Sequence, residues 1–429
     1  MRLPGLARRA GWGVADQVIS SLVNFGLGIA VARVGTLEEF GAYGLAFAAY
    51  LVAINLTRPA SMEPLIIRFS SGAPEAWRRA FAEATGALVV VGAGIGIVAI
   101  ILGVVLGGFT GAVFVLLGLG LPGLTLQDGW RLGFFAERRG RAAFFNDLTW
   151  AVVLFGAIGV MSATDSITAF GVIAAWVIGG NLAAILGFVQ AATRPRPAST
   201  RVWWRAQRDL GRPLVAEHVV TNVTSELTPF GIGLVTDIGA VGALRGAQLL
   251  LGPFNVLFQA ISLVALPEAV RIAERSRRRL RGAAVVFSAS LASGVLAVGL
   301  VVLALPEPMG VALLGETWAA TREVMLPYTM VSVGMMAAAG PSVGLRAMGA
   351  GREILSVGIV RSVLTLVGAM IGAEYGGAPS AAAGMAVGTW IGTTFAWFRF
   401  LHVVDQPPVD QPPADPAVGG SADSAPAAA

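Results

Sequence analysis

The chain has no cysteine, no lysine and only two histidines among its 429 residues. Without cysteine it can form neither disulfides nor thiolate metal sites. Charged residues are also scarce, at 13%, whereas soluble domains carry about 25%. Hydrophobic residues make up 55% of the chain and the mean hydropathy is +0.74. This composition excludes a soluble fold around a single core and favours an integral membrane protein.

Long apolar stretches predict an all-α membrane protein. A helix needs roughly 20 apolar residues to cross the ~30 Å hydrocarbon layer. Stretches of this kind recur about twelve times, without the alternation expected of strands. The expected spans are 11–33, 41–62, 81–106, 109–127, 146–163, 169–192, 213–236, 240–266, 283–305, 322–345, 354–373 and 380–401.

The connections between these spans alternate in charge. One set is rich in arginine, including 194–212 and 271–281, and the other set is short and acidic or uncharged. The positive-inside rule places the arginine-rich set in the cytoplasm, with both termini inside. The expected location is therefore the bacterial cytoplasmic membrane, as a multi-pass protein whose first helix is not cleaved. Basic loops of this kind contact anionic membrane lipids, so we do not expect nucleic acid as a partner.

The two halves of the sequence resemble each other. Phe25–Gly28 matches Phe230–Gly233 at an offset of 205, and Phe40–Ala42 matches Val241–Ala243 at an offset of 201. Repeated six-span units of equal orientation predict two parallel lobes around a central cavity. The expected division is an N-terminal lobe (1–193), a cytoplasmic linker (194–212), a C-terminal lobe (213–402) and a disordered cytoplasmic tail (403–429), which is rich in Pro, Ala and Asp.

Two stretches carry a resemblance to a known family. DIGAVGALRGAQLLLGPFNVLFQAISLVALPEAVRIAE (237–274) resembles the seventh and eighth helices of bacterial polysaccharide (O-antigen, Wzx-type) flippases. NFGLGIAVARVGTLEEFGAYGLAFA and QDGWRLGFFAERRGRAAFFND are similar to earlier parts of the same family. The superfamily, called MOP, also holds the MATE drug exporters and the lipid II flippase. The resemblance extends over roughly residues 10 to 400.

The resemblance implies a flippase that moves isoprenoid-diphosphate-linked oligosaccharide between leaflets by alternating access. It implies no catalytic residues, no metal and no cofactor, and leaves open coupling to a proton or sodium gradient or to the membrane potential. A polysaccharide polymerase and glycosyltransferases are the expected partners. Two alternatives stay open. One is a MATE-like multidrug or cation antiporter, and the other is a flippase-fold scaffold for glycan-assembly enzymes.

Five arginines lie outside the cytoplasmic connections: Arg33, Arg58, Arg245, Arg322 and Arg361. A charge within the bilayer is costly and normally faces a cavity or a partner. Arginine stems also reach the interface from within the membrane, and Arg322 is interpreted as such an interfacial anchor. The other four are predicted to line a cavity that holds the substrate diphosphate.

The seventh span is the most polar. Its residues His218, Asn222 and Glu226 fall on neighbouring positions of one helix face. One interpretation is a site for a coupling ion or proton formed by Glu226 with His218 and Asn222, or an ion pair between Glu226 and a cavity arginine. The alternative is a hydrogen-bonded cluster between helices. In the first span, Asp16 is expected to cap the helix or to pair with Arg8 or Arg9.

Overall fold

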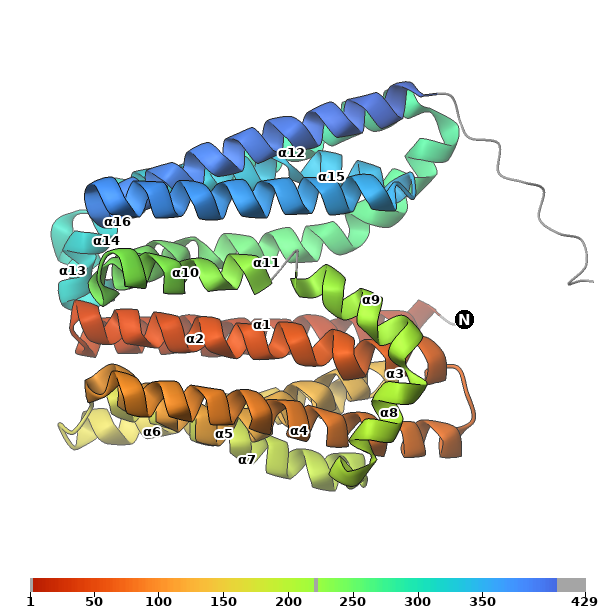
Figure 1. The fold of residues 1–429 in the computed structure, drawn as a ribbon, viewed down its shortest axis with the longest axis horizontal. Coiled ribbons are helices and arrows are strands. Elements are labelled where there is room, and N and C mark those ends of the chain that lie inside the picture. Colours follow the sequence, from red (N-terminus) through yellow and green to blue (C-terminus); the bar gives the residue numbers. More distant parts are fainter. Residues whose placement is uncertain (1–2, 220–222, 407–429) are drawn as a thin grey trace, which may run out of the picture.

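The computed structural model describes residues 3–219 and 223–406, and these residues form helices and short turns without any strand. Figure 1 shows two helical bundles stacked on each other, with α1–α7 in one and α10–α16 in the other. The helices are α1 (Leu3–Val34), α2 (Leu37–Thr57), η1 (Arg58–Met62), α3 (Glu63–Phe69), α4 (Pro74–Leu106), α5 (Gly108–Ala136), α6 (Gly140–Ala163), α7 (Ala169–Ala191), η2 (Pro197–Ser199), α8 (Thr200–Ala206), α9 (Arg208–His218), α10 (Thr224–Val235), α11 (Ile238–Arg275), α12 (Arg277–Leu303), α13 (Glu307–Leu314), η4 (Gly315–Thr317), α14 (Trp318–Ala337), α15 (Ala339–Ala347) and α16 (Gly351–Asp405).

The all-α membrane fold predicted from the sequence is confirmed. Within the described ranges, nine helices are long and apolar enough to cross a membrane. The last of these, α16, contains two spans because Gly376 and Gly377 leave the helical conformation and fold the chain back. One further crossing is made by α9 together with α10, and another by α11. The total of about twelve agrees with the number expected from hydropathy. The predicted tail lies almost wholly outside the described residues.

Several span boundaries differ from the prediction. The fourth span was expected to end at residue 127, but α5 continues to Ala136. No helix-breaking proline follows Pro122 in this stretch, and the chain turns only where Arg138 adopts a positive φ of 62°. The described part of the seventh span comprises α9 and α10, and residues 220–222 between them lie outside the described ranges. The extension of α5 matters for function because it brings two charged side chains into the helix.

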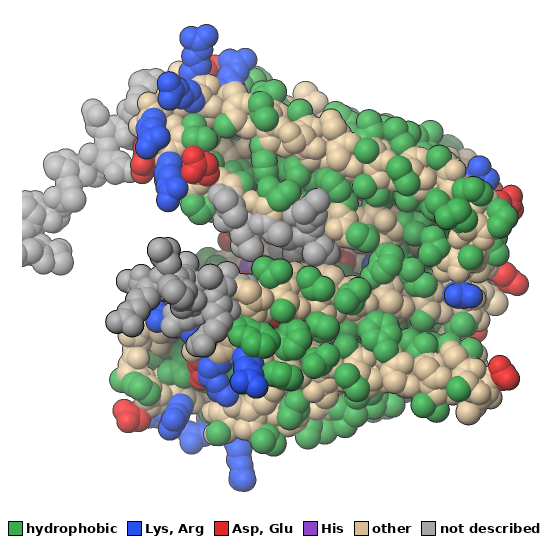
Figure 2. All heavy atoms as spheres, turned by 180° about the vertical axis from the view of Figure 1, so that it is seen from behind, with side chains coloured by type: hydrophobic (Ala, Val, Ile, Leu, Met, Phe, Trp, Pro, Cys, Tyr) green, Lys and Arg blue, Asp and Glu red, His purple; other side chains and the backbone are tan. Residues whose placement is uncertain are grey.

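The two ends of the molecule differ in charge. Both the start of α1 and the end of α16 lie at one end (Figure 1). Figure 2 shows arginine side chains gathered at that end and mostly acidic charges at the other, and we call the two the arginine-rich end and the acidic end. The same view shows a hollow between the bundles that opens at the arginine-rich end.

Reciprocal contacts between glycines and helix starts close the bundles at the acidic end. A Cβ at Gly41 of α2 would lie 1.9 Å from the carbonyl oxygen of Ile238, the first residue of α11. A Cβ at Gly242 of α11 would lie 2.4 Å from the carbonyl oxygen of Leu37, the first residue of α2. Both pairs are related by the offset of 201 seen in the sequence. The absence of side chains at these two positions allows the helices to cross in backbone contact.

Candidate functional site: a cationic cavity between the bundles

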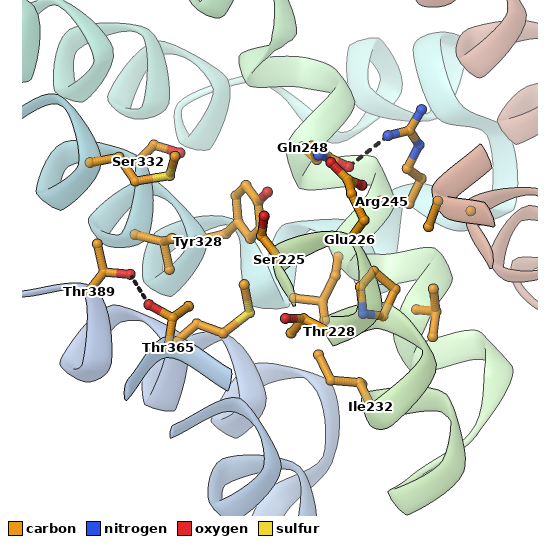
Figure 3. A pocket seen from close by; sticks show the side chains of 18 of the residues that line it. Ser225, Glu226, Thr228, Ile232, Arg245, Gln248, Tyr328, Ser332, Thr365 and Thr389 are labelled. Atoms are coloured by element: carbon orange, nitrogen blue, oxygen red, sulfur yellow. Dashed lines mark hydrogen bonds between the residues drawn. The ribbon is translucent and has the colours of Figure 1, made fainter. Parts of the chain in front are cut away.

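A cavity of about 340 Å³ lies between the two bundles. Its wall comes from α2 on one side and from α10, α11, α14 and α16 on the other (Figure 3). Its charged side chains are Glu226, Arg245 and Arg361, and the uncharged polar side chains are Ser225, Thr228, Gln248, Tyr328, Ser332, Ser362, Thr365 and Thr389. The wall thus combines an excess of positive charge with many hydroxyl groups.

Arg245 connects the two bundles. Its Nη1 donates a 2.6 Å hydrogen bond to Gln248 Oε1 on its own helix (Figure 3), and its Nη2 donates to Tyr43 Oη on α2 at 3.3 Å. The guanidinium carbon lies 4.1 Å from the ring centroid of Phe47, also on α2, which is cation–π geometry. Its Nε is buried without a hydrogen-bond acceptor among the described atoms. No carboxylate of the described residues forms an ion pair with this cation, so an anionic ligand meets a partly unsatisfied guanidinium.

Arg361 is the second cation of this wall. It projects from the first half of α16, and Gly392 in the second half gives it room, because a Cβ there would lie 2.8 Å from the Arg361 Cα. Across the described residues no hydrogen bond or ion pair to Arg361 is formed. Its charge is repelled by the nearby Arg346. Glu226 is the carboxylate of this wall and interacts electrostatically with Arg245.

A smaller cavity of about 170 Å³ lies inside the first bundle. Phe47 and Leu51 line both cavities, so α2 separates them. Arg58 faces this smaller cavity and is paired: its Nε and Nη2 donate to the two carboxylate oxygens of Asp128 at 2.8 and 2.6 Å. A bidentate pair of this kind is among the stronger charge-assisted contacts. Arg58 was predicted to line the substrate cavity, and the structure places it on the smaller cavity with Asp128 as its partner.

Arg131 forms the centre of a second charge cluster that sequence reasoning missed. Its Nε donates to Asp16 Oδ2 at 2.8 Å and lies 3.3 Å from Asp147 Oδ2. Gln127 donates from Nε2 to Asp147 Oδ1 at 2.7 Å. Asp16 was expected to cap the helix or to pair with Arg8 or Arg9, and its partner among the described side chains is Arg131. Gln127, Asp128 and Arg131 are spaced i, i+1 and i+4, as polar residues on one face of a helix are. This spacing is the sequence signal from which the cluster could have been found.

Arg33 and His218 do not line the central cavity. Arg33 is exposed at the acidic end and lines neither cavity. The same holds for Arg322, which was interpreted as an interfacial anchor. His218 Nε2 lies 3.2 Å from Glu63 Oε1 of α3, so His218 pairs with the first bundle and not with Glu226. The predicted pairing of His218 with Glu226 is therefore not formed. Asn222 lies outside the described residues. Of the predicted arginines, the structure brings Arg245 and Arg361 to one cavity.

The Arg58–Asp128 pair gives a stability prediction. Replacing Asp128 with Asn leaves Arg58 facing the small cavity without a counter-charge. We expect a loss of about 2 kcal/mol, less than the ~3–5 kcal/mol of a fully buried pair, because the Arg58 side chain keeps some exposure. Thermal unfolding of the detergent-solubilised protein measures it. The matched control is Asp165→Asn, an exposed acid in a turn. Equal midpoints for the two variants would contradict the assignment of this pair.

The fold is similar to that of solved membrane proteins. No protein-family model and no curated protein matches the chain. A lipid II flippase, MurJ, in an inward closed conformation is 12% identical and superposes with a TM-score of 0.70 over 92% of this chain and 89% of that chain. An inward-facing multidrug resistance MATE transporter of the MOP superfamily is also 12% identical, with a TM-score of 0.69 over 90% and 94%.

A further MATE structure shares the fold to a lesser degree. An outward-facing MATE transporter, 15% identical and covering 93% of this chain and 95% of that chain, reaches a TM-score of only 0.52. The chain has the fold of the MurJ and MATE structures of the MOP superfamily.

Proposed function

We propose that the chain is an alternating-access flippase that moves isoprenoid-diphosphate-linked oligosaccharide from the inner to the outer leaflet. The observation that carries this proposal is the pair Arg245 and Arg361, two cations of the cavity between the bundles with which no described carboxylate forms an ion pair. A diphosphate suits them because guanidinium forks bind phosphate oxygens in pairs. The hydroxyl-rich remainder of the wall suits a sugar.

The orientation follows from charge. We place the arginine-rich end, and with it both termini, in the cytoplasm on the basis of the positive-inside rule. The membrane that we propose is the bacterial cytoplasmic one. The hollow then faces the side on which a lipid-linked oligosaccharide is assembled. Glu226 is the proposed coupling group, because it is the carboxylate of the central wall and its charge opposes that of Arg245. Protonation of Glu226 would leave Arg245 free to hold the substrate.

The experiment that tests the proposal is depletion of the protein in its native cell. Spheroplasts are treated with an impermeant glycan-cleaving enzyme before and after the membrane is opened. We expect lipid-linked oligosaccharide to accumulate and to stay protected until opening, as a substrate held in the inner leaflet should. Normal accessibility in intact depleted spheroplasts would overturn the proposal.

One observation favours a MATE-like cation antiporter as the second candidate. The small cavity is lined by Asp128 and Asp147 beside Arg58 and Arg131. Asp16, which is bound to Arg131 outside the lining, gives the whole cluster one more acid than it has arginines. The central cavity has the opposite sign, which disfavours a cationic cargo there. Uptake of a cationic dye into vesicles containing the protein, driven by a proton or sodium gradient, is the result expected of the antiporter and not of the flippase.

A further inference from the structure

The segment that joins the two bundles is folded and anchored to the first bundle. The backbone N–H of Arg196 donates to the carbonyl oxygen of Ala82 on α4 at 2.8 Å. The linker crosses α4 over Gly86, where a Cβ would lie 2.3 Å from the Arg196 backbone. From there α8 lies over the first bundle at the arginine-rich end, and α9 leads from it toward the second bundle (Figure 1). The linker is therefore a fixed part of the surface.

Two side-chain contacts hold these helices in place. Trp203 of α8 is 1% exposed and packs against Phe69 of α3, with ring centroids 6.2 Å apart. Arg68 of α3 donates to Gln207 Oε1 at 2.7 Å and to the Ala206 carbonyl oxygen at 3.1 Å. Residues on the other side of α8 and α9 are thereby turned outward.

A cavity of about 980 Å³ lies between these helices, α4 and η1, and we call it the linker cavity. Its apolar part comes from Ala60, Val90, Val215 and Ala216. Val90 belongs to α4, an apolar membrane-crossing helix, and is 39% exposed. Trp204 also lines the cavity and is 40% exposed. The cavity therefore has an apolar floor continuous with the exposed face of a membrane span.

Four arginines surround the same cavity: Arg201, Arg205, Arg208 and Arg212. They form two pairs at i, i+4 spacing, one in each helix, so that each pair projects from one helix face. All four are exposed, and within the described ranges none takes part in an ion pair or side-chain hydrogen bond. The acid nearest in sequence, Asp209, is bound by Arg68 instead. The four charges are thus left for a ligand.

We propose that the linker cavity binds an anionic glycerophospholipid, with its phosphate among the four arginines and an acyl chain along Val90 and Ala216. Two features select this occupant. An amphipathic ligand is required by a cavity that is cationic at its rim and apolar on its floor. An anionic lipid is drawn to a basic cluster at the level of the membrane surface, whereas a zwitterionic lipid gains little. The proposal is independent of the substrate assigned to the central cavity.

Trp204 provides the test, because its indole lines the cavity. The full-length protein is reconstituted in vesicles that contain a small fraction of acyl-brominated phosphatidylglycerol or acyl-brominated phosphatidylcholine. The Trp204 signal is the difference in fluorescence between the wild type and Trp204→Phe. We expect brominated phosphatidylglycerol to quench this signal about fivefold more effectively than brominated phosphatidylcholine, because several arginines contribute to the preference.

Matched charge variants decide the outcome. The variant R201Q/R205Q/R208Q/R212Q should lose the preference, so that the two lipids quench Trp204 equally. The control R275Q/R278Q/R279Q/R281Q removes four exposed arginines at the same end of the other bundle and should keep it. Equal quenching by both lipids in the wild type, or a preference that persists in the first variant, overturns the proposal. Because quenching reports binding and not flipping, failure of the proposed flippase activity leaves this test unaffected.

Discussion

Replacing both Arg245 and Arg361 with Gln should abolish export of the lipid-linked oligosaccharide. Each charge-assisted hydrogen bond to a phosphate contributes ~1.5–3 kcal/mol, so losing two such contacts should weaken substrate binding by roughly a hundredfold or more. Neither side chain forms an ion pair with a described carboxylate, and Glu226, which interacts electrostatically with Arg245, is the acid of the cavity wall that the double variant affects. In depleted cells complemented with the double variant, we expect the glycan lipid to stay protected in intact spheroplasts.

The matched control for this prediction is the double variant Arg33→Gln with Arg322→Gln. It removes the same charge from residues that are exposed at the acidic end and line neither cavity. It should restore glycan accessibility to the wild-type level. Equal activity of the two double variants would show that the cavity cations do not bind the substrate. That result would move the scaffold hypothesis ahead of the flippase hypothesis.

Introducing a methyl group at Gly41 or Gly242 should open the acidic end. The new Cβ would lie 1.9 or 2.4 Å from a backbone oxygen of the other bundle, and no side-chain movement relieves a clash with backbone. Overpacking of this kind costs ~1–3 kcal/mol, which shifts the balance between conformations by roughly tenfold to a hundredfold. Because the clash exists only while the bundles touch at this end, the open conformation escapes it.

The shift is measurable because the natural chain contains no cysteine. Spin labels on Glu38→Cys and Glu374→Cys, exposed residues of the two bundles, report the distance across the acidic end. Gly41→Ala and Gly242→Ala should both populate longer distances than the parent. Gly94→Ala is the control, because a Cβ there meets nothing within 4 Å. Unchanged distance distributions in both Gly41→Ala and Gly242→Ala would contradict a rigid backbone contact at the acidic end.

The fold could be predicted from the sequence because the main determinant of a membrane fold is hydropathy. Spans of ~20 apolar residues and the alternation of arginine between connections are local properties. The repeat was also visible, and its offset of 201 relates the two glycines that close the acidic end. What the repeat could not indicate is that Gly41 and Gly242 each contact the start of the other's helix, since such contact depends on how the bundles are stacked.

The site was only partly predictable because charge pairing is a property of tertiary structure. Arg245 and Arg361 were found from their depth in the membrane, which is a local signal. The partner of Arg58 was missed because Asp128 was placed beyond the end of a span, although α5 continues to Ala136. His218 was grouped with Glu226 on one helix face, but its ring lies against Glu63 of α3, a contact that depends on how α9 packs on the first bundle.

The most direct measurement of the central claim uses the purified protein alone. It is reconstituted in sealed vesicles that carry lipid-linked oligosaccharide in both leaflets, and an impermeant glycan-cleaving enzyme is added outside. In vesicles without protein, cleavage should stop once the outer-leaflet share is consumed. With the protein present, we predict that cleavage continues to completion as the inner-leaflet share is moved out. Cleavage that stops at the same level with and without the protein would contradict its role as a flippase.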